Sequence, residues 1–309
     1  MKSFRKLALI STIATYVLIF VGGLVRVSGA GLGCPDWPKC FGRWIPPTDI
    51  SQLPAGMDPS LFNFTLAWIE YINRLTGMIV GLLIAATGIM AIIKMRKYPK
   101  ILYPSILAAL LVAFQGWQGS RVVSSALEPF IITVHLVLAL LIVSLMIFVT
   151  QQAYYSENNS APVQREFKKY KMWAGILWFV TLSQIILGTQ IRAVIKEISD
   201  NYPLLPTAEW IDMIGPIVNV HTVFGILITG LSIMLVTRLY NDKPVFHGPV
   251  KLISVTLIVL VGLQMVVGIG FKAAGIEPVL QVTHLWISSL MIGGELILYT
   301  MFNFAENRK

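Results

Sequence analysis

Eight apolar segments, each long enough to cross a lipid bilayer, constrain this chain more than any other feature. A spanning helix needs roughly 20 mostly apolar residues. Only 13% of the 309 residues are charged, against about 25% in soluble domains. In lipid, every backbone polar group must be bonded internally, so such segments form helices. The sequence predicts an all-α integral membrane protein with eight transmembrane helices, approximately at residues 7–27, 67–93, 101–123, 129–152, 172–194, 213–238, 250–272 and 279–303.

Lysine and arginine residues gather in alternate loops. The loops near residues 94–100, 165–171 and 238–251 and both termini are basic, whereas most acidic residues lie in the other loops. The positive-inside rule therefore predicts cytoplasmic N- and C-termini in a multi-pass protein of the cell membrane. It also explains the net charge of +9, and no aromatic–basic pattern favours nucleic acid as a partner. We expect the first segment to be retained, because it is longer than a signal-peptide core.

The two halves of the chain resemble each other. The segment QGWQGSRVVSSALEPFIITVH (115–135) aligns without a gap with QMVVGIGFKAAGIEPVLQVTH (264–284), and EYINRLTGMIVG aligns with VNVHTVFGILIT, which places Asn73 opposite His221. Repeats of equal orientation predict two pseudo-symmetric four-helix bundles related by an axis along the membrane normal. We expect an N-terminal bundle at 1–152, a cytoplasmic linker at 153–170 and a C-terminal bundle at 171–309.

Three histidines lie inside the predicted spans: His135, His221 and His284. A single histidine in a helix is often a satisfied core residue, but all three lie at a similar depth, ~10 Å from the outer end. Ionisable residues at membrane depth are rare and usually functional. Imidazole groups on facing helices suit axial ligation of haem iron, with His221 and His284 as a pair. Zinc is less favoured, because no Cys, Asp or Glu accompanies that pair.

Four basic residues mark the outer ends of the odd-numbered spans: Arg26, Arg121, Arg192 and Lys272. They are placed to pair with the propionate groups of a haem near the outer face. The alternative is that they are interfacial side chains that extend to water.

Two further features belong to the first half. Glu70 and Asn73 have the spacing that puts both on one face of a helix, and a carboxylate there suits proton transfer or stabilisation of positive charge. Cys34 and Cys40 lie in a loop, rich in glycine and proline, on the oxidising side. Their spacing permits a disulfide, either structural or redox-active.

Nearly the whole chain resembles the haem A synthase family. The resemblance rests on GGLVRVSGAGLGCPDWPKC (22–40), IEYINRLTG (69–77), QGWQGSRV (115–122) and the paired histidine helices. It implies an oxidoreductase that holds haem b in one bundle and oxidises the C8 methyl of haem O to a formyl group in the other, which makes haem A for terminal oxidases. It further implies that His221 and His284 hold haem b, that His135 is a ligand in the substrate half, that Glu70 is the catalytic carboxylate and that Cys34 and Cys40 are the outer-loop cysteine pair.

Asn73 departs from the pattern of that family, which usually has Glu-x-x-His at Glu70–Asn73. Asparagine is a poor iron ligand, so the substrate haem has His135 alone. Two opposite hypotheses follow: the open iron position binds oxygen directly, or the site has lost activity and only binds haem. The alternative function is thus a non-catalytic haem b protein for electron transfer or haem handling. A transporter is disfavoured, because no pair of broken helices is evident. Because haem O is large and apolar, we also expect contact with a haem O synthase within the membrane.

Overall fold

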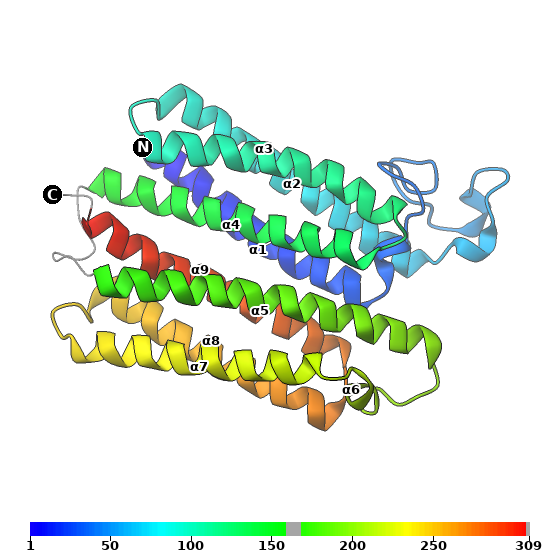
Figure 1. The fold of residues 1–309 in the computed structure, drawn as a ribbon. Coiled ribbons are helices and arrows are strands. Elements are labelled where there is room, and N and C mark those ends of the chain that lie inside the picture. Colours follow the sequence, from blue (N-terminus) through cyan, green and yellow to red (C-terminus); the bar gives the residue numbers. More distant parts are fainter. Residues whose placement is uncertain (159–167, 307–309) are drawn as a thin grey trace. The chain divides into compact units, whose positions relative to one another are not determined.

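The computed structural model describes residues 1–158 and 168–306 of the chain (Figure 1). Within these ranges the structure is helical, and the sole β-type pairing is an isolated bridge between Cys40 and Arg43. Eight helices are long and apolar enough to span a membrane, which confirms the predicted number. They are α1 (Lys2–Val27), α2 (Phe64–Lys94), α3 (Pro99–Ser124), α4 (Pro129–Asn158), α5 (Lys168–Asn201), α7 (Ile217–Asn241), α8 (Gly248–Ala274) and α9 (Pro278–Glu306).

The helix ends follow from local sequence signals. Asn63 caps α2, since its side chain accepts a hydrogen bond from the Leu66 amide at 3.1 Å. The Glu128 carboxylate accepts bonds from the amides of Phe130 and Ile131 at the start of α4. Such caps satisfy amides that have no partner within the helix. Gly275 ends α8 with a φ of +78°, a conformation that favours glycine.

One helix extends well beyond its predicted span. Helix α5 continues to Asn201, whereas the apolar segment was expected to end near residue 194. The added turns are polar and carry an ion pair between Lys196 and Asp200 at 2.7 Å. Their inner face packs Ile195 and Ile198 against Ile214 and Ile276. Hydropathy alone misses such an amphipathic extension.

Residues 159–167, half of the predicted linker 153–170, lie outside the described residues, as do 307–309. The chain divides into two compact units. The N-terminal unit comprises Leu7–Val143. The C-terminal unit comprises Ser144–Lys309 together with Met1–Lys6. The boundaries 1–152 and 171–309, the cytoplasmic position of the termini and the pseudo-symmetry of the bundles remain predictions.

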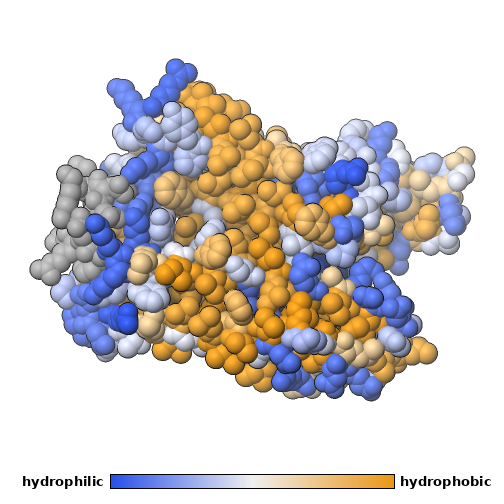
Figure 2. Space-filling model, viewed as in Figure 1, coloured by the Kyte–Doolittle hydropathy of each residue, from blue (hydrophilic) through white to orange (hydrophobic). Residues whose placement is uncertain are grey.

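The C-terminal unit contains a closed ring of four helices. Helix α5 packs on α9, α9 on α8, α8 on α7 and α7 on α5. Leucines from all four helices form its core: Leu177, Leu235, Leu257 and Leu298, each at most 1% exposed. Apolar side chains also cover the outside of the spans, with hydrophilic residues gathered towards the helix ends (Figure 2), as expected for helices that face lipid.

Polar contacts join the helices of the N-terminal unit. Ser11 of α1 and Thr87 of α2 are hydrogen-bonded at 3.1 Å. Helices α2 and α3 approach closely at Gly88, where an added Cβ would lie 2.9 Å from the Cβ of Ala109. Gln115 of α3 donates to the His135 carbonyl of α4 at 2.9 Å.

Candidate functional site

The C-terminal unit brings two of the predicted ligands close together. His221 lies in the second turn of α7 and His284 in the second turn of α9. Their ring centroids are 6.3 Å apart, with the ring planes inclined by 47°. A metal–imidazole bond is about 2 Å long and the bonded nitrogen lies about 1.1 Å from its ring centre, so two imidazoles bound to one iron atom on opposite sides have centroids roughly 6.2 Å apart. The observed centroid separation of 6.3 Å therefore fits one iron atom bound by both histidines.

Glycines make room for both rings. A Cβ on Gly188 of α5 would lie 3.3 Å from the Cε1 atom of His221, and a Cβ on Gly268 of α8 would lie 3.8 Å from the Cε1 atom of His284. Phe271 packs edge-on against His284, with ring centroids 5.4 Å apart. A Cβ at Gly188 would press on the His221 ring, whereas one at Gly268 would be in ordinary van der Waals contact with His284.

The polar atoms of the pair also point to an absent partner. The Nδ1 atoms of His221 and His284 are buried and have no hydrogen-bond partner among the described residues. Buried polar groups are normally satisfied. No three His, Cys, Asp or Glu side chains in the described ranges form a group that would hold a bare metal ion. Two histidines alone suit an iron whose remaining ligands come from a porphyrin.

The two basic residues predicted to pair with propionates in this half, Arg192 and Lys272, differ in burial. Arg192 of α5 is partly buried, and its Nε atom has no hydrogen-bond partner among the described residues. Lys272, near the end of α8, is exposed. Arg192 therefore retains a donor for an anionic group, whereas the position of Lys272 is equally that of an interfacial residue.

His135, the ligand predicted in the N-terminal unit, has a hydrogen-bonded ring. Its Nδ1 atom donates to the Oε1 atom of Gln118 on α3. The Gln118 Nε2 atom donates to the Ile131 carbonyl at 2.7 Å, which fixes the orientation of the amide. With a proton on Nδ1, the Nε2 atom keeps the lone pair that binds a metal. Gly119 faces the ring, with a built Cβ 3.6 Å from Cε1, so the glycine contact recurs in both units.

Glu70 forms a second polar group in the N-terminal unit. This residue of α2 is 5% exposed. Its Oε1 atom accepts a bond from the Nε atom of Arg74 at 2.8 Å, and the amide of Asn73 is another polar neighbour of the carboxyl group. No hydrogen bond or ion pair among the described residues joins Glu70 to His135. The structure thus pairs Glu70 with Arg74, a partner that was not predicted from the sequence.

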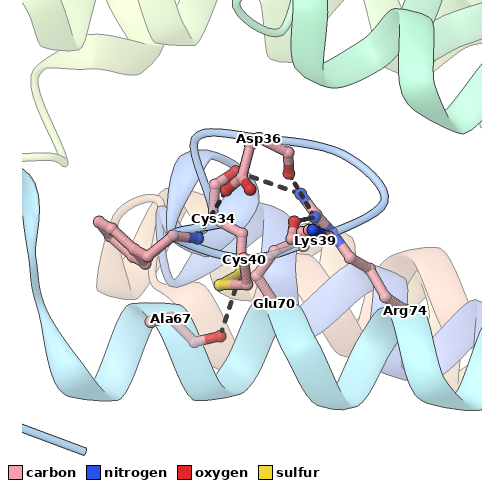
Figure 3. A network of polar contacts seen from close by, with 8 residues as sticks. Cys34, Asp36, Lys39, Cys40, Ala67, Glu70 and Arg74 are labelled. Carbon is pink, nitrogen blue, oxygen red and sulfur yellow. Dashed lines mark hydrogen bonds and ion pairs between the residues drawn. A yellow bond between two sulfur atoms is a disulfide. The ribbon is translucent and has the colours of Figure 1, made fainter. Parts of the chain in front are cut away.

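The loop between α1 and α2 is closed by a disulfide between Cys34 and Cys40, as predicted. Figure 3 shows that Arg74 reaches from α2 into this loop. Its Nη1 atom donates to the carbonyls of Asp36 at 2.6 Å and Lys39 at 2.8 Å, and its Nη2 atom donates to the Cys34 carbonyl at 3.1 Å. The loop lies on a small apolar cluster that includes Phe41 and Ala67.

The remaining predicted residues of this unit lie at helix ends. Arg26 lies in the last turn of α1 and is half-buried, with interactions of its own. Arg121, in the last turn of α3, is exposed. Both positions suit a propionate partner or an interfacial side chain.

Gln118 and Arg74 were not predicted as site residues, although both carried signals in the sequence. Gln115 and Gln118 are spaced (i, i+3), so they share the face of α3 that meets α4. Arg74 is a charge within an apolar segment, which usually has a specific partner, and it is four residues from Glu70. Gln184 of α5, which donates to the His221 carbonyl at 2.7 Å, carried the weaker signal of an isolated amide in a span.

The chain is similar to known proteins over most of its length. The model of the COX15-CtaA family, described as "Cytochrome oxidase assembly protein", matches residues 5–294. A "Heme A synthase" of Shouchella clausii is 24% identical over 90% of this chain and 87% of its own length. The protein of that name from Halalkalibacterium halodurans is 23% identical over 94% of both chains, and that of Shewanella oneidensis is 31% identical over 58% of this chain and 54% of its own length. The chain belongs to the COX15-CtaA family of cytochrome oxidase assembly proteins.

Proposed function

We propose that this protein is a haem A synthase, a membrane oxidoreductase that converts haem O to haem A. The family membership and the name of its relatives support the reaction. The observation that carries it in the structure is the His221–His284 pair, whose 6.3 Å separation suits a bound haem iron. Two hydroxylations of the C8 methyl, each of which passes two electrons to an external electron acceptor, give a diol that loses water to form the formyl group.

The residues divide between a resident cofactor and a substrate. His221 and His284 would hold haem b, which supplies a one-electron redox centre when bound. Arg192 and Lys272 would pair with its propionates. Haem b as the cofactor is supported by the paired, unpartnered imidazoles and the glycines that make room for them.

The N-terminal unit would receive haem O. His135 binds the substrate iron through Nε2, and Gln118 holds the ring in that tautomer. Arg26 and Arg121 pair with the propionates, and Asn73 lies where the aligned repeat has His221. Glu70, which is ion-paired with Arg74 at 2.8 Å, accepts a proton or stabilises positive charge that develops at the methyl carbon.

The setting of the reaction follows from the same proposal. Eight apolar helices and the charge distribution support a multi-pass protein of the cell membrane with both haem sites towards the outer face. Haem O is apolar enough to pass within the bilayer, so a haem O synthase is the expected donor. A pull-down from native membranes that recovers no such enzyme would count against this partnership.

Product analysis tests the proposal directly. The chain is expressed with a source of haem O, and the non-covalent haems are extracted and chromatographed. Haem A or its hydroxylated precursor is expected. Haem b alone, with haem O supplied and the protein folded, would instead support the non-catalytic haem protein.

Asn73 is the observation that favours this second candidate. An Asn73→His variant distinguishes the two hypotheses for this position, an open iron position that binds oxygen and a site that has lost activity. If the variant makes haem A and the parent makes none, the open-site hypothesis is wrong and the asparagine accounts for lost activity. If the parent makes haem A, the open iron position is compatible with catalysis.

A further inference from the structure

All three carbonyl groups that bind the Arg74 guanidinium belong to one covalent ring. They are those of Cys34, Asp36 and Lys39, and the disulfide closes the segment from Cys34 to Cys40. The fourth acceptor is the Glu70 carboxylate. A single side chain therefore connects the disulfide loop to the proposed catalytic acid, as Figure 3 shows.

The loop is held in the conformation that presents these carbonyls. The Asp36 carboxylate accepts bonds from the amides of Phe41 at 2.6 Å and Gly42 at 2.8 Å. On the other side the loop is seated on the backbone of α2, because a Cβ on Gly33 would collide with the Leu66 carbonyl. The Sγ atom of Cys34 lies 3.6 Å from the Ala67 carbonyl, one turn before Glu70.

The burial of Arg74 and Glu70 makes the position of their hydrogen-bond partners important. The side chains of Arg74 and Glu70 are only 14% and 7% exposed, so their charges are poorly solvated. A partly buried guanidinium needs acceptors with the fixed spacing of its donor fork. The disulfide supplies that spacing for the three carbonyls, since a closed ring has far fewer conformations than an open loop.

We infer that Arg74 is a positioning residue that couples the redox state of Cys34 and Cys40 to the Glu70 carboxylate. An external dithiol reduces the disulfide: the S–S bond breaks, two S–H bonds form, and the dithiol is oxidised to its own disulfide. In the open loop the three carbonyls no longer hold the guanidinium, and Glu70 loses a fixed partner. The inference rests on the proposed function only for the role of Glu70 in the reaction.

Carbodiimide labelling of Glu70 tests the coupling. Dicyclohexylcarbodiimide modifies protonated carboxyl groups in apolar surroundings, so a carboxylate paired with arginine reacts slowly. The full chain is labelled in its oxidised form, and again after reduction with dithiothreitol and blocking of the thiols with iodoacetamide. Mass spectrometry of the peptides follows Glu70. Glu295, in the other unit and bonded to Thr181, is the internal reference.

We expect reduction to raise Glu70 labelling about tenfold, since the charge-assisted bonds that fix the carboxylate are lost, while Glu295 labelling stays constant. Arg74→Gln should give high labelling in both redox states. Arg43→Gln is the matched control, because the exposed Arg43 donates to the Gln52 carbonyl outside the disulfide ring; it should behave as the parent. Equal Glu70 labelling before and after reduction of the parent overturns the inference.

Two features keep the outcome interpretable. The comparison of oxidised and reduced parent needs no variant, so a misfolded Arg74→Gln protein does not block the test. Labelling also needs no haem conversion. Redox-dependent labelling in a chain that makes no haem A rejects the proposed function alone, and redox-independent labelling in a chain that makes haem A rejects the coupling alone.

Discussion

The ring of His135 on α4 and the amide of Gln118 on α3 form one hydrogen-bonded unit, in which Nδ1 donates to Oε1. The repeat has valine at the position aligned with Gln118, Val267, and the Nδ1 atom of His284 has no hydrogen-bond partner among the described residues. The aligned histidines His135 and His284 thus differ in whether Nδ1 has a hydrogen-bond partner. A fixed tautomer suits a histidine that must bind and release a substrate iron repeatedly.

Gln118→Leu should weaken the binding of haem O by about tenfold or more, because it removes the partner that fixes a ligand histidine. The dissociation constant is measured by optical titration of the purified protein. Gln115→Leu is the control, since Gln115 bonds to the His135 backbone carbonyl and not to the ring. Equal losses in the two variants would show that the tautomer of His135 does not matter.

Replacing either member of the His221–His284 pair should abolish the low-spin absorption of the proposed resident haem, because each is a proposed axial ligand. His135→Ala should leave that absorption intact, since His135 belongs to the other unit. The optical spectra of the three purified variants decide the matter. A His135→Ala protein without the low-spin spectrum would mean that the resident haem lies in the N-terminal unit.

Gly188→Ala should lower the haem content severalfold, because overpacking a fitted site costs about 1–3 kcal/mol and the new Cβ would press on His221 at 3.3 Å. Gly268→Ala, with 3.8 Å to His284, should be tolerated better. Gly81→Ala on α2 has nothing within 4 Å and is the neutral control. The ratio of haem to protein is the readout, and equal ratios in all three would contradict the fit of the pair.

Thr181→Val should destabilise the C-terminal unit by about 1–3 kcal/mol, the cost of leaving a buried polar group unsatisfied. Thr181 donates to the fully buried Glu295 at 2.9 Å, and the second oxygen of Glu295 has no partner among the described residues. The free energy of unfolding in detergent is measured by denaturant titration. Thr222→Val is the control, because the exposed Thr222 bonds only to the Val218 carbonyl of its own helix; a loss of equal size there would make the Glu295 contact irrelevant.

The sequence was sufficient for the helices, because the demand for internal hydrogen bonding in lipid leaves few alternatives for long apolar segments. It was insufficient for the C-terminal turns of α5, where charged residues such as Lys196 and Asp200 alternate with the buried Ile195 and Ile198 and lower the mean hydropathy. It also left Glu295 unexplained, since its partner Thr181 lies on another helix, and the sequence does not give the rotation of α5 about its axis.

For the site, residue type and depth were enough to find the three histidines, and spacing was enough for the disulfide. The contacts of Arg74 could not be predicted, because three of its acceptors are backbone carbonyls. Every residue carries such a group, so no side-chain pattern distinguishes Cys34, Asp36 and Lys39 as its partners. Their convergence depends on the folded shape of the loop.

The order of helices in the C-terminal ring has a mechanical consequence. Helices α7 and α9 each pack on α5 and α8, so His221 and His284 stand on opposite corners of the bundle. A ligand bound by both histidines would connect α7 directly to α9, two helices that otherwise contact each other mainly through α5 and α8. The binding free energy of a haem bound there would add to the stability of the fold, so the proposed cofactor would itself hold this unit together.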